Sequence, residues 1–135
     1  MRKIQTFFCL LIFTMIFFGC NEKPINKIDK IKVSHPLSDS EINTVVIEEV
    51  AQQLGVSKKK IIPNEVFSNQ PNNGDLLDVV EVTIAIEERL GIMIIDKEID
   101  RAANSKNSTE TPHKLKISTF QEVVRKTYHQ KYNKK

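Results

Sequence analysis

The clearest apolar pattern in the chain lies between Asp75 and Gly91, where it has the period of an α-helix. Four aliphatic residues recur there at spacings of three or four positions and so share one face: Val79, Val82, Ile86 and Leu90. Asp75 is a favourable N-cap, and Gly91 is a typical helix stop. The pattern therefore predicts a helix of about four turns with one buried face.

A second apolar line runs along the same segment, outside the predicted core face: Leu76, Leu77, Val80 and Ile84. Acidic residues border it, and an apolar strip with acidic edges is suited to a basic partner surface. We therefore predict that this helix binds a protein with a basic patch. The predicted partner-binding residues are Asp75, Leu76, Asp78, Val80, Glu81, Ile84, Glu87 and Glu88. The alternative interpretation is a solvated charged face without a partner.

A helix is also predicted before this segment. Ser38 and Glu41 have the spacing of a capping box, and apolar residues then recur at helical spacing as far as Leu54, before Gly55. Residues 56–73 hold three consecutive lysines and many turn-forming residues. They predict a long connection.

The C-terminal third of the chain predicts a short helix over about residues 96–102 and one further main helix. Ser118 or Thr119 is expected to cap that last helix, with Thr119 and Glu122 at capping-box spacing. Residues 104–116 are polar and are expected to be a mobile loop, and residues 129–135 a frayed basic tail. The predicted fold is all-α, a bundle of three main helices plus one short helix with a long first loop.

The first 19 residues have a basic start, at Arg2 and Lys3, followed by an apolar run of signal-peptide length. The run is too short for a comfortable transmembrane span. Gly19-Cys20 and the polar residues that follow resemble the lipobox of bacterial lipoproteins, although Phe17 stands where an aliphatic residue is usual. This resemblance implies cleavage before Cys20 and attachment of acyl chains, such as palmitate, to that residue. An uncleaved anchor is the alternative.

Lipidation of Cys20 implies a place in the bacterial cell envelope, outside the cytosol, on either the outer or the cytoplasmic membrane. It also implies a mature chain without a free thiol, because Cys9 leaves with the leader and Cys20 is acylated. The predicted organisation is a signal peptide over residues 1–19, a tether over 20–37, a helical domain over 38–130 and a basic tail over 131–135.

Charge and motif content favour binding over catalysis. The formal net charge is +3, but acidic residues dominate the middle of the chain and basic residues its end. No basic stripe with interleaved aromatic residues is present, so nucleic acid is not an expected partner. His35, His113 and His129 are far apart in the sequence, and we expect no metal site. The sequence lacks a G-x-S-x-G elbow, and we expect no enzymatic activity.

Several segments, in this order, resemble acyl carrier proteins over about residues 42–128. They are LGVSKKKI, Phe67, GDLLDVVEVTIAIEERLGI, IDKEID and ISTFQEVV. Members of that family bear a phosphopantetheine arm on the serine of an Asp-Ser-Leu triplet at the start of this helix. Here the triplet is Asp75-Leu76-Leu77, and a leucine has no hydroxyl to modify. The resemblance therefore implies the carrier fold without a cofactor, and the nearest serine, Ser68, lies outside the motif.

Two functions follow from these observations. The first is a membrane-tethered, acyl-carrier-like lipoprotein that binds a partner protein through residues 75–91. The alternative is an acyl carrier in lipid or fatty-acid metabolism with atypical attachment, or a bundle that shelters an acyl chain without a covalent bond. Transfer of phosphopantetheine uses coenzyme A in the cytosol, so location outside the cytosol favours the first.

Overall fold

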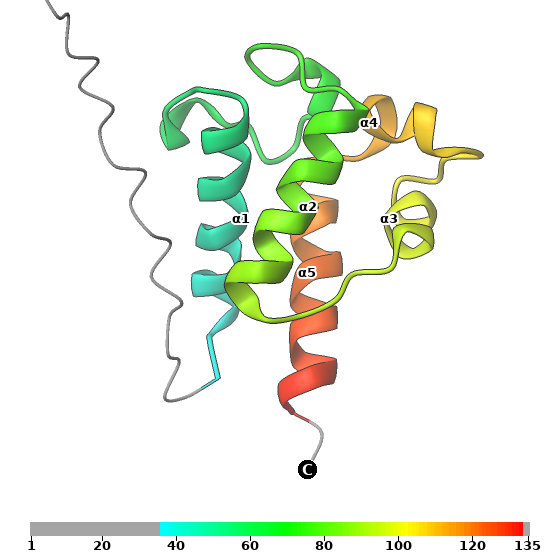
Figure 1. The fold of residues 1–135 in the computed structure, drawn as a ribbon. Coiled ribbons are helices and arrows are strands. Elements are labelled where there is room, and N and C mark those ends of the chain that lie inside the picture. Colours follow the sequence, from blue (N-terminus) through cyan, green and yellow to red (C-terminus); the bar gives the residue numbers. More distant parts are fainter. Residues whose placement is uncertain (1–35, 134–135) are drawn as a thin grey trace, which may run out of the picture.

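The computed structural model describes residues 36–133, which form a bundle of helices (Figure 1). Its α-helices are α1 (Asp39–Gln53), α2 (Leu76–Leu90), α3 (Asp96–Ala102), α4 (Thr111–Lys114) and α5 (Ile117–Tyr132). Three short 3₁₀ turns join them: η1 (Lys58–Lys60), η2 (Phe67–Asn69) and η3 (Ser108–Glu110). The prediction of an all-α bundle is confirmed. The expected signal peptide and nearly all of the expected tether lie outside the described residues.

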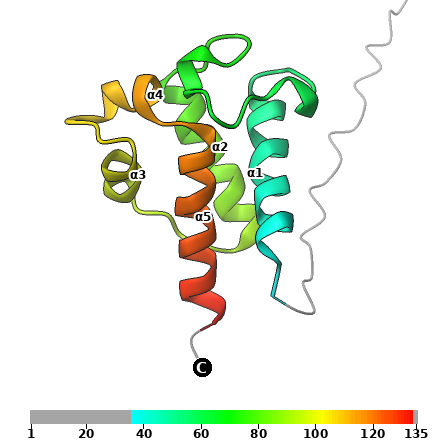
Figure 2. The same cartoon turned by 180° about the vertical axis from the view of Figure 1, so that it is seen from behind.

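Helices α1, α2 and α5 surround the core, and α3 covers α2 and α5 on the side away from α1 (Figures 1 and 2). Helix α1 runs antiparallel to the other two long helices. The aromatic centre of the core is Phe67 against Phe120, with ring centroids 5.8 Å apart and planes at 72°. Both rings are fully buried. This edge-to-face packing joins the long first connection to α5.

The predicted capping box at the start of α1 is present, and the predicted N-cap of α2, Asp75, forms a capping box with Asp78. Ser38 caps α1 together with Glu41, whose carboxylate accepts from the Ser38 amide at 2.8 Å. Asp75 caps α2, and its Oδ1 accepts from the amides of Leu77 and Asp78 at 2.8 and 3.1 Å. These bonds satisfy amide groups that a helix start leaves without partners. Local sequence therefore fixes where α1 and α2 begin.

The long connection between α1 and α2 is held by buried polar contacts. The side chain of Gln70 is almost fully buried and bonds both the amide and the carbonyl of Ile62, each at 2.9 Å. At the end of the connection, a Cβ atom on Gly74 would lie 3.0 Å from the Phe67 carbonyl oxygen. A glycine is needed there because the two backbone segments approach so closely.

Residues 104–116 are not the open loop that their composition predicts. The segment contains η3 and α4, and Thr111 and Pro112 are buried. Its order comes from Asp100 at the end of α3, whose Oδ1 accepts from the Thr111 hydroxyl at 2.6 Å and whose Oδ2 accepts from the Ser108 hydroxyl at 3.2 Å. The prediction of a mobile loop is wrong because one carboxylate on another element orders the segment.

Helix α5 also differs from its predicted bounds at both ends. It begins at Ile117, with Lys116 as an N-cap that makes no side-chain bond, so the predicted cap at Ser118 or Thr119 is wrong. Its start is set by the first connection, because the Ile117 amide donates to the Glu65 carbonyl at 3.1 Å. Its end lies at Tyr132, beyond the residue-129 start of the predicted frayed tail.

The end of α5 is held by α1. His129 Nε2 lies 2.7 Å from Asp39 Oδ1, and the Tyr128 hydroxyl accepts from the Leu37 amide at 2.9 Å. The two contacts tie the last turns of α5 to the residues where the chain enters the bundle. No helix within residues 36–133 has the length and apolarity needed to span a membrane.

Candidate functional site

The outer face of α2 carries three large aliphatic side chains that the bundle leaves exposed. Leu77 is 62%, Val80 44% and Ile84 49% exposed. The opposite face of the helix, with Val79, Val82, Ile86 and Leu90, is buried as predicted. The capping of α2 at Asp75 fixes its register, and three residues of the predicted second apolar line face outward, whereas the fourth, Leu76, is half-buried. Leu77 is the most exposed of the line, although the predicted partner-binding set omits it.

The acidic residues of α2 divide into two groups. Asp78 completes the capping box and accepts from Gln53 Nε2 at 3.0 Å, and Glu87 accepts from the Ile94 amide. Both carboxylates therefore hold the bundle together, a role that the predicted partner-binding set did not assign to them. Glu81 is exposed and accepts a hydrogen bond from Gln53. Glu88 is exposed and has no bonded partner among residues 36–133.

The only basic residue of α2, Arg89, turns away from this face toward α1. Its guanidinium donates to Glu49 and Glu48, both at 2.6 Å. Lys58 also binds Glu48, at 2.7 Å, and this bond is the main cause that lowers the pKa of Glu48, with Arg89 adding to it against the effect of burial. The bonds to Glu49 and Glu48 outweigh burial and raise the pKa of Arg89. The outer face of α2 therefore keeps its acidic character.

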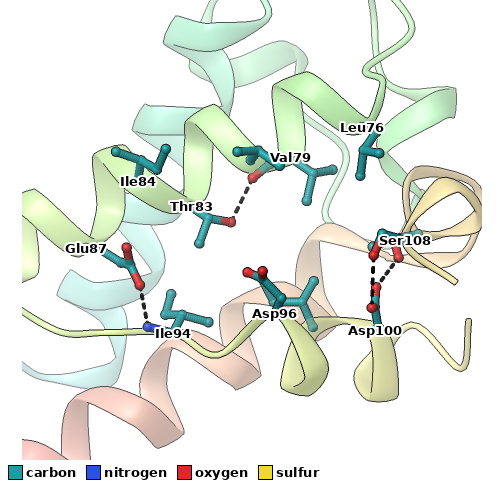
Figure 3. A pocket seen from close by; sticks show the side chains of 12 residues that line it. Leu76, Val79, Thr83, Ile84, Glu87, Ile94, Asp96, Asp100 and Ser108 are labelled. Carbon is teal, nitrogen blue, oxygen red and sulfur yellow. Dashed lines mark hydrogen bonds between the residues drawn. The ribbon is translucent and has the colours of Figure 1, made fainter.

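A cleft of about 310 Å³ opens beside this face, between α2, α3 and the segment that carries η3 (Figure 3). From α2 it is lined by Leu76, Val79, Val80, Thr83, Ile84 and Glu87; from the other side by Ile94, Asp96, Ile99, Asp100, Ser108 and Thr111. Leu76 is the first residue of α2 and is half-buried at one end of the cleft. No pattern in the sequence indicates Ser108 and Thr111, which their bonds to Asp100 bring to the cleft.

Most polar groups in the cleft bond to the protein itself. The Thr83 hydroxyl donates to the Val79 carbonyl at 2.7 Å, and Asp100 accepts from Ser108 and Thr111. Figure 3 shows these bonds at the cleft edges, with aliphatic side chains between them. Asp96 also lines the cleft and makes no side-chain bond within residues 36–133, but half of the lining side chains are aliphatic, so the space between them can take an apolar group.

Two predicted features fall elsewhere. Cys20 and His35 lie outside the described residues, and His113 and His129 lie on different helices, α4 and α5. Within residues 36–133, no group of three or more His, Cys, Asp or Glu side chains could hold a metal ion.

The chain is similar to acyl carrier proteins. It is 38% identical over 65 residues to the acyl carrier protein of Thermosynechococcus vestitus, an alignment that covers 48% of this chain and 79% of the relative. It is 34% identical over 74 residues to the acyl carrier protein of Cyanidium caldarium, covering 55% of this chain and 85% of the relative. No protein-family model matches the chain.

Proposed function

The chain belongs to the acyl carrier protein family, and we propose that it is a carrier-like protein that binds a partner through α2 without bearing a phosphopantetheine arm. Leu76 is the observation that carries the proposal. The family resemblance assigns the modified serine to the position directly after the N-cap Asp75, where Leu76 begins the helix. A leucine side chain has no oxygen on which a phosphodiester could form.

The surface that would meet a partner is retained although the attachment point is lost. Exposed Leu77, Val80 and Ile84 supply apolar area, and Glu81 and Glu88 supply negative charge beside it. The partner is a protein with a basic, partly apolar patch, and its association is expected to weaken as salt rises. The function is binding, without catalysis by this chain.

The proposal includes a membrane anchor at Cys20 in the bacterial cell envelope, with residues 1–19 removed as a signal peptide and residues 20–37 as a tether. The support is the leader-like composition and the lipobox-like Gly19-Cys20. Two acyl chains are enough for stable attachment to a membrane. Coenzyme A, the donor of the arm, is a cytosolic substrate, so this location agrees with the loss of a modifiable residue at position 76.

The proposal predicts a gain of modification from one substitution. Wild-type protein incubated with coenzyme A and a broad-specificity phosphopantetheinyl transferase should keep its mass, whereas Leu76→Ser should gain one arm by intact-mass spectrometry. The reason is that α2 retains the capped helix start and acidic face of a carrier. Leu77→Ser is the control, because it places a hydroxyl one residue too late. An arm on the wild-type chain, at Ser68 or elsewhere, would contradict the proposal.

The docking role is tested by charge reversal on α2. The double variant Glu81→Lys, Glu88→Lys should bind the partner captured by wild-type protein about tenfold more weakly. The reason is the loss of two contacts at the rim of the interface, each of about 0.7 kcal/mol. Glu122→Lys combined with Glu65→Lys makes the same charge change on α5 and the first connection and should leave binding unchanged. Titration at several salt concentrations measures both. An equal loss of binding affinity in the two double variants would contradict a docking role of α2.

A second candidate function is non-covalent binding of an acyl chain, and the 310 Å³ cleft is the observation that favours it. Native mass spectrometry and lipid extraction of purified protein should then reveal a bound chain. Val80→Glu places a charge in the cleft lining and should abolish binding, whereas Leu77→Glu lies outside the lining and should retain it. An empty protein in the presence of excess fatty acid would contradict this function.

A further inference from the structure

We propose that one end of the bundle faces the membrane, with Met93 in contact with lipid. This end consists of the start of α1, the connection between α2 and α3, and the last turn of α5, and we call it the basal end (Figures 1 and 2). The inference rests on the lipid anchor at Cys20 proposed above. It identifies the surface of the domain that this anchor holds against the bilayer.

Side-chain contacts place the start of the domain beside the α2–α3 connection. The Leu37 amide donates to the Tyr128 hydroxyl at 2.9 Å, and the rings of Tyr128 and Tyr132 lie 4.6 Å apart. The Tyr132 hydroxyl then donates at 3.1 Å to the carbonyl of Leu90, the last residue of α2. The chain that leads back to Cys20 therefore leaves the bundle at the basal end.

The basal end also carries the most exposed large apolar side chain of the described residues. Met93 is 79% exposed. Ile95, two residues further along the chain, is also exposed, and so is Tyr132, which contacts the end of α2. A methionine adapts its shape to an irregular apolar surface, and a tyrosine suits the boundary between lipid and water. The three side chains together fit a lipid surface.

The length of chain between the anchor and the domain makes even a weak contact effective. Fifteen residues separate Cys20 from Pro36, so the chain between these two residues reaches at most about 55 Å. A covalent link of this size gives an effective concentration on the order of millimolar, and a contact too weak to recruit the free domain still sets its orientation. The acyl chains attach the protein to the membrane, and the contact of Met93 determines which end of the bundle faces the lipid.

Charges at the basal end are of both signs, which determines the kind of lipid contact expected. Exposed Lys131 lies on the last turn of α5, and exposed Glu88 lies near the end of α2. Asp39 is paired with His129 on the same end. Within residues 36–133 this end therefore has no excess of positive charge, and we expect the contact of Met93 itself to be apolar and independent of the proportion of anionic lipid.

This orientation places Leu76 at the other end of α2, away from the bilayer, because the helix runs from the distal end of the bundle to the basal end (Figure 1). The start of α2, one end of the cleft and Leu77 then face the compartment in which a partner diffuses. The basal end turns toward lipid and the distal end toward the partner.

The test uses full-length lipidated protein reconstituted in phosphatidylcholine vesicles. A polarity-sensitive fluorophore is attached through Met93→Cys, with Ile62→Cys as the matched control because Ile62 is also exposed but lies in the first connection at the distal end. Mass spectrometry first establishes that Cys20 is lipidated. On vesicles, the fluorescence emission of the label at position 93 should shift to shorter wavelength. Brominated lipid should then lower the intensity of that emission. The label at position 62 should show neither change.

The results separate the anchor from the orientation. If Cys20 carries lipid but the two labels are quenched equally, or the label at 62 more strongly, the proposed orientation is overturned and the anchor stands. A chain without lipid on Cys20 overturns the anchor and, with it, the orientation. Replacing half of the phosphatidylcholine with phosphatidylglycerol should leave the contrast between positions 93 and 62 unchanged, and a contrast that appears only with the anionic lipid overturns the apolar contact.

Discussion

Gly91 shows how much of the end of α2 depends on a single residue. Its φ of 62° is left-handed, and its amide donates to the Glu87 carbonyl to close the helix. A Cβ atom here would lie 3.1 Å from the Tyr132 hydroxyl, which itself bonds the Leu90 carbonyl. Glycine is therefore required at this position both for backbone conformation and for the contact between α2 and α5.

Gly91→Ala should lower the free energy of unfolding by about 1–2 kcal/mol, because an alanine is strained in this conformation. Urea denaturation followed by circular dichroism measures the change. Gly55→Ala is the matched control, since Gly55 has a similar φ of 65° and no atom within 4 Å of the added carbon. Gly91→Ala should cost more than the control, and an equal or larger loss at Gly55 would show that the contact with Tyr132 contributes nothing.

At the scale of whole elements, the sequence predicts α1, α2 and α3 well because their signals are local. The capping residues Ser38 and Asp75 and the stop at Gly91 lie within or beside the helices that they define. The start of α5 and the order of residues 104–116 depend instead on Glu65 and Asp100, which lie on other segments. Local patterns carry no information about such contacts, so these predictions fail.

The candidate site divides in the same way. The outward direction of Val80 and Ile84 follows from helical spacing, and the structure confirms it. The structural roles of Asp78 and Glu87 and the approach of Ser108 to the cleft arise from neighbouring elements. Sequence periodicity shows which side chains share a face, whereas tertiary contacts decide which of them remain available to a partner.

The junction of α1, η1 and α2 at Glu48 should give stability a pH dependence. Because the folded-state pKa of Glu48 is lowered, its contribution is fully present above the ordinary glutamate pKa and is lost as pH falls through the folded value. Glu48→Gln should therefore destabilise the domain at pH 7, by less than about 1 kcal/mol for a partly exposed pair.

The difference between wild type and Glu48→Gln should shrink as the pH falls from the ordinary glutamate pKa through the lowered folded-state pKa, below which the wild-type carboxylate is protonated in both states. Urea unfolding at a series of pH values provides the measurement. Glu88→Gln is the control, because Glu88 has no bonded partner in residues 36–133 and its removal should give no such trend. A constant difference at all pH values would refute the role of ionised Glu48.

At the scale of the molecule, the described residues share one hydrophobic core. Its buried apolar side chains run from Leu37 to Tyr128, and the two aromatic rings at its centre join segments 53 residues apart, Phe67 and Phe120. The domain boundary near residue 37 stays a prediction, and truncation tests it.

A fragment that begins at Pro36 should fold without the leader and tether. It should have a helical circular dichroism spectrum and a single cooperative unfolding transition, because it retains Leu37 and its bond to Tyr128. A fragment that begins at Glu41 is the comparison, since it lacks Leu37, the Ser38 cap and Asp39, and it should be less stable. Equal stability of the two fragments would contradict a domain boundary at residues 36–37.

The bond between the Leu37 amide and the Tyr128 hydroxyl also determines how the protein bears mechanical force. A pull on the chain before Leu37 first loads this bond and the Ser38 cap, where α1 meets α5. Helix α2 lies further along that load path, because Tyr128 reaches it through Tyr132, whose hydroxyl bonds the Leu90 carbonyl. Force on a protein held at its N-terminal side would therefore unfold the first turn of α1 before it disturbed the surface of α2.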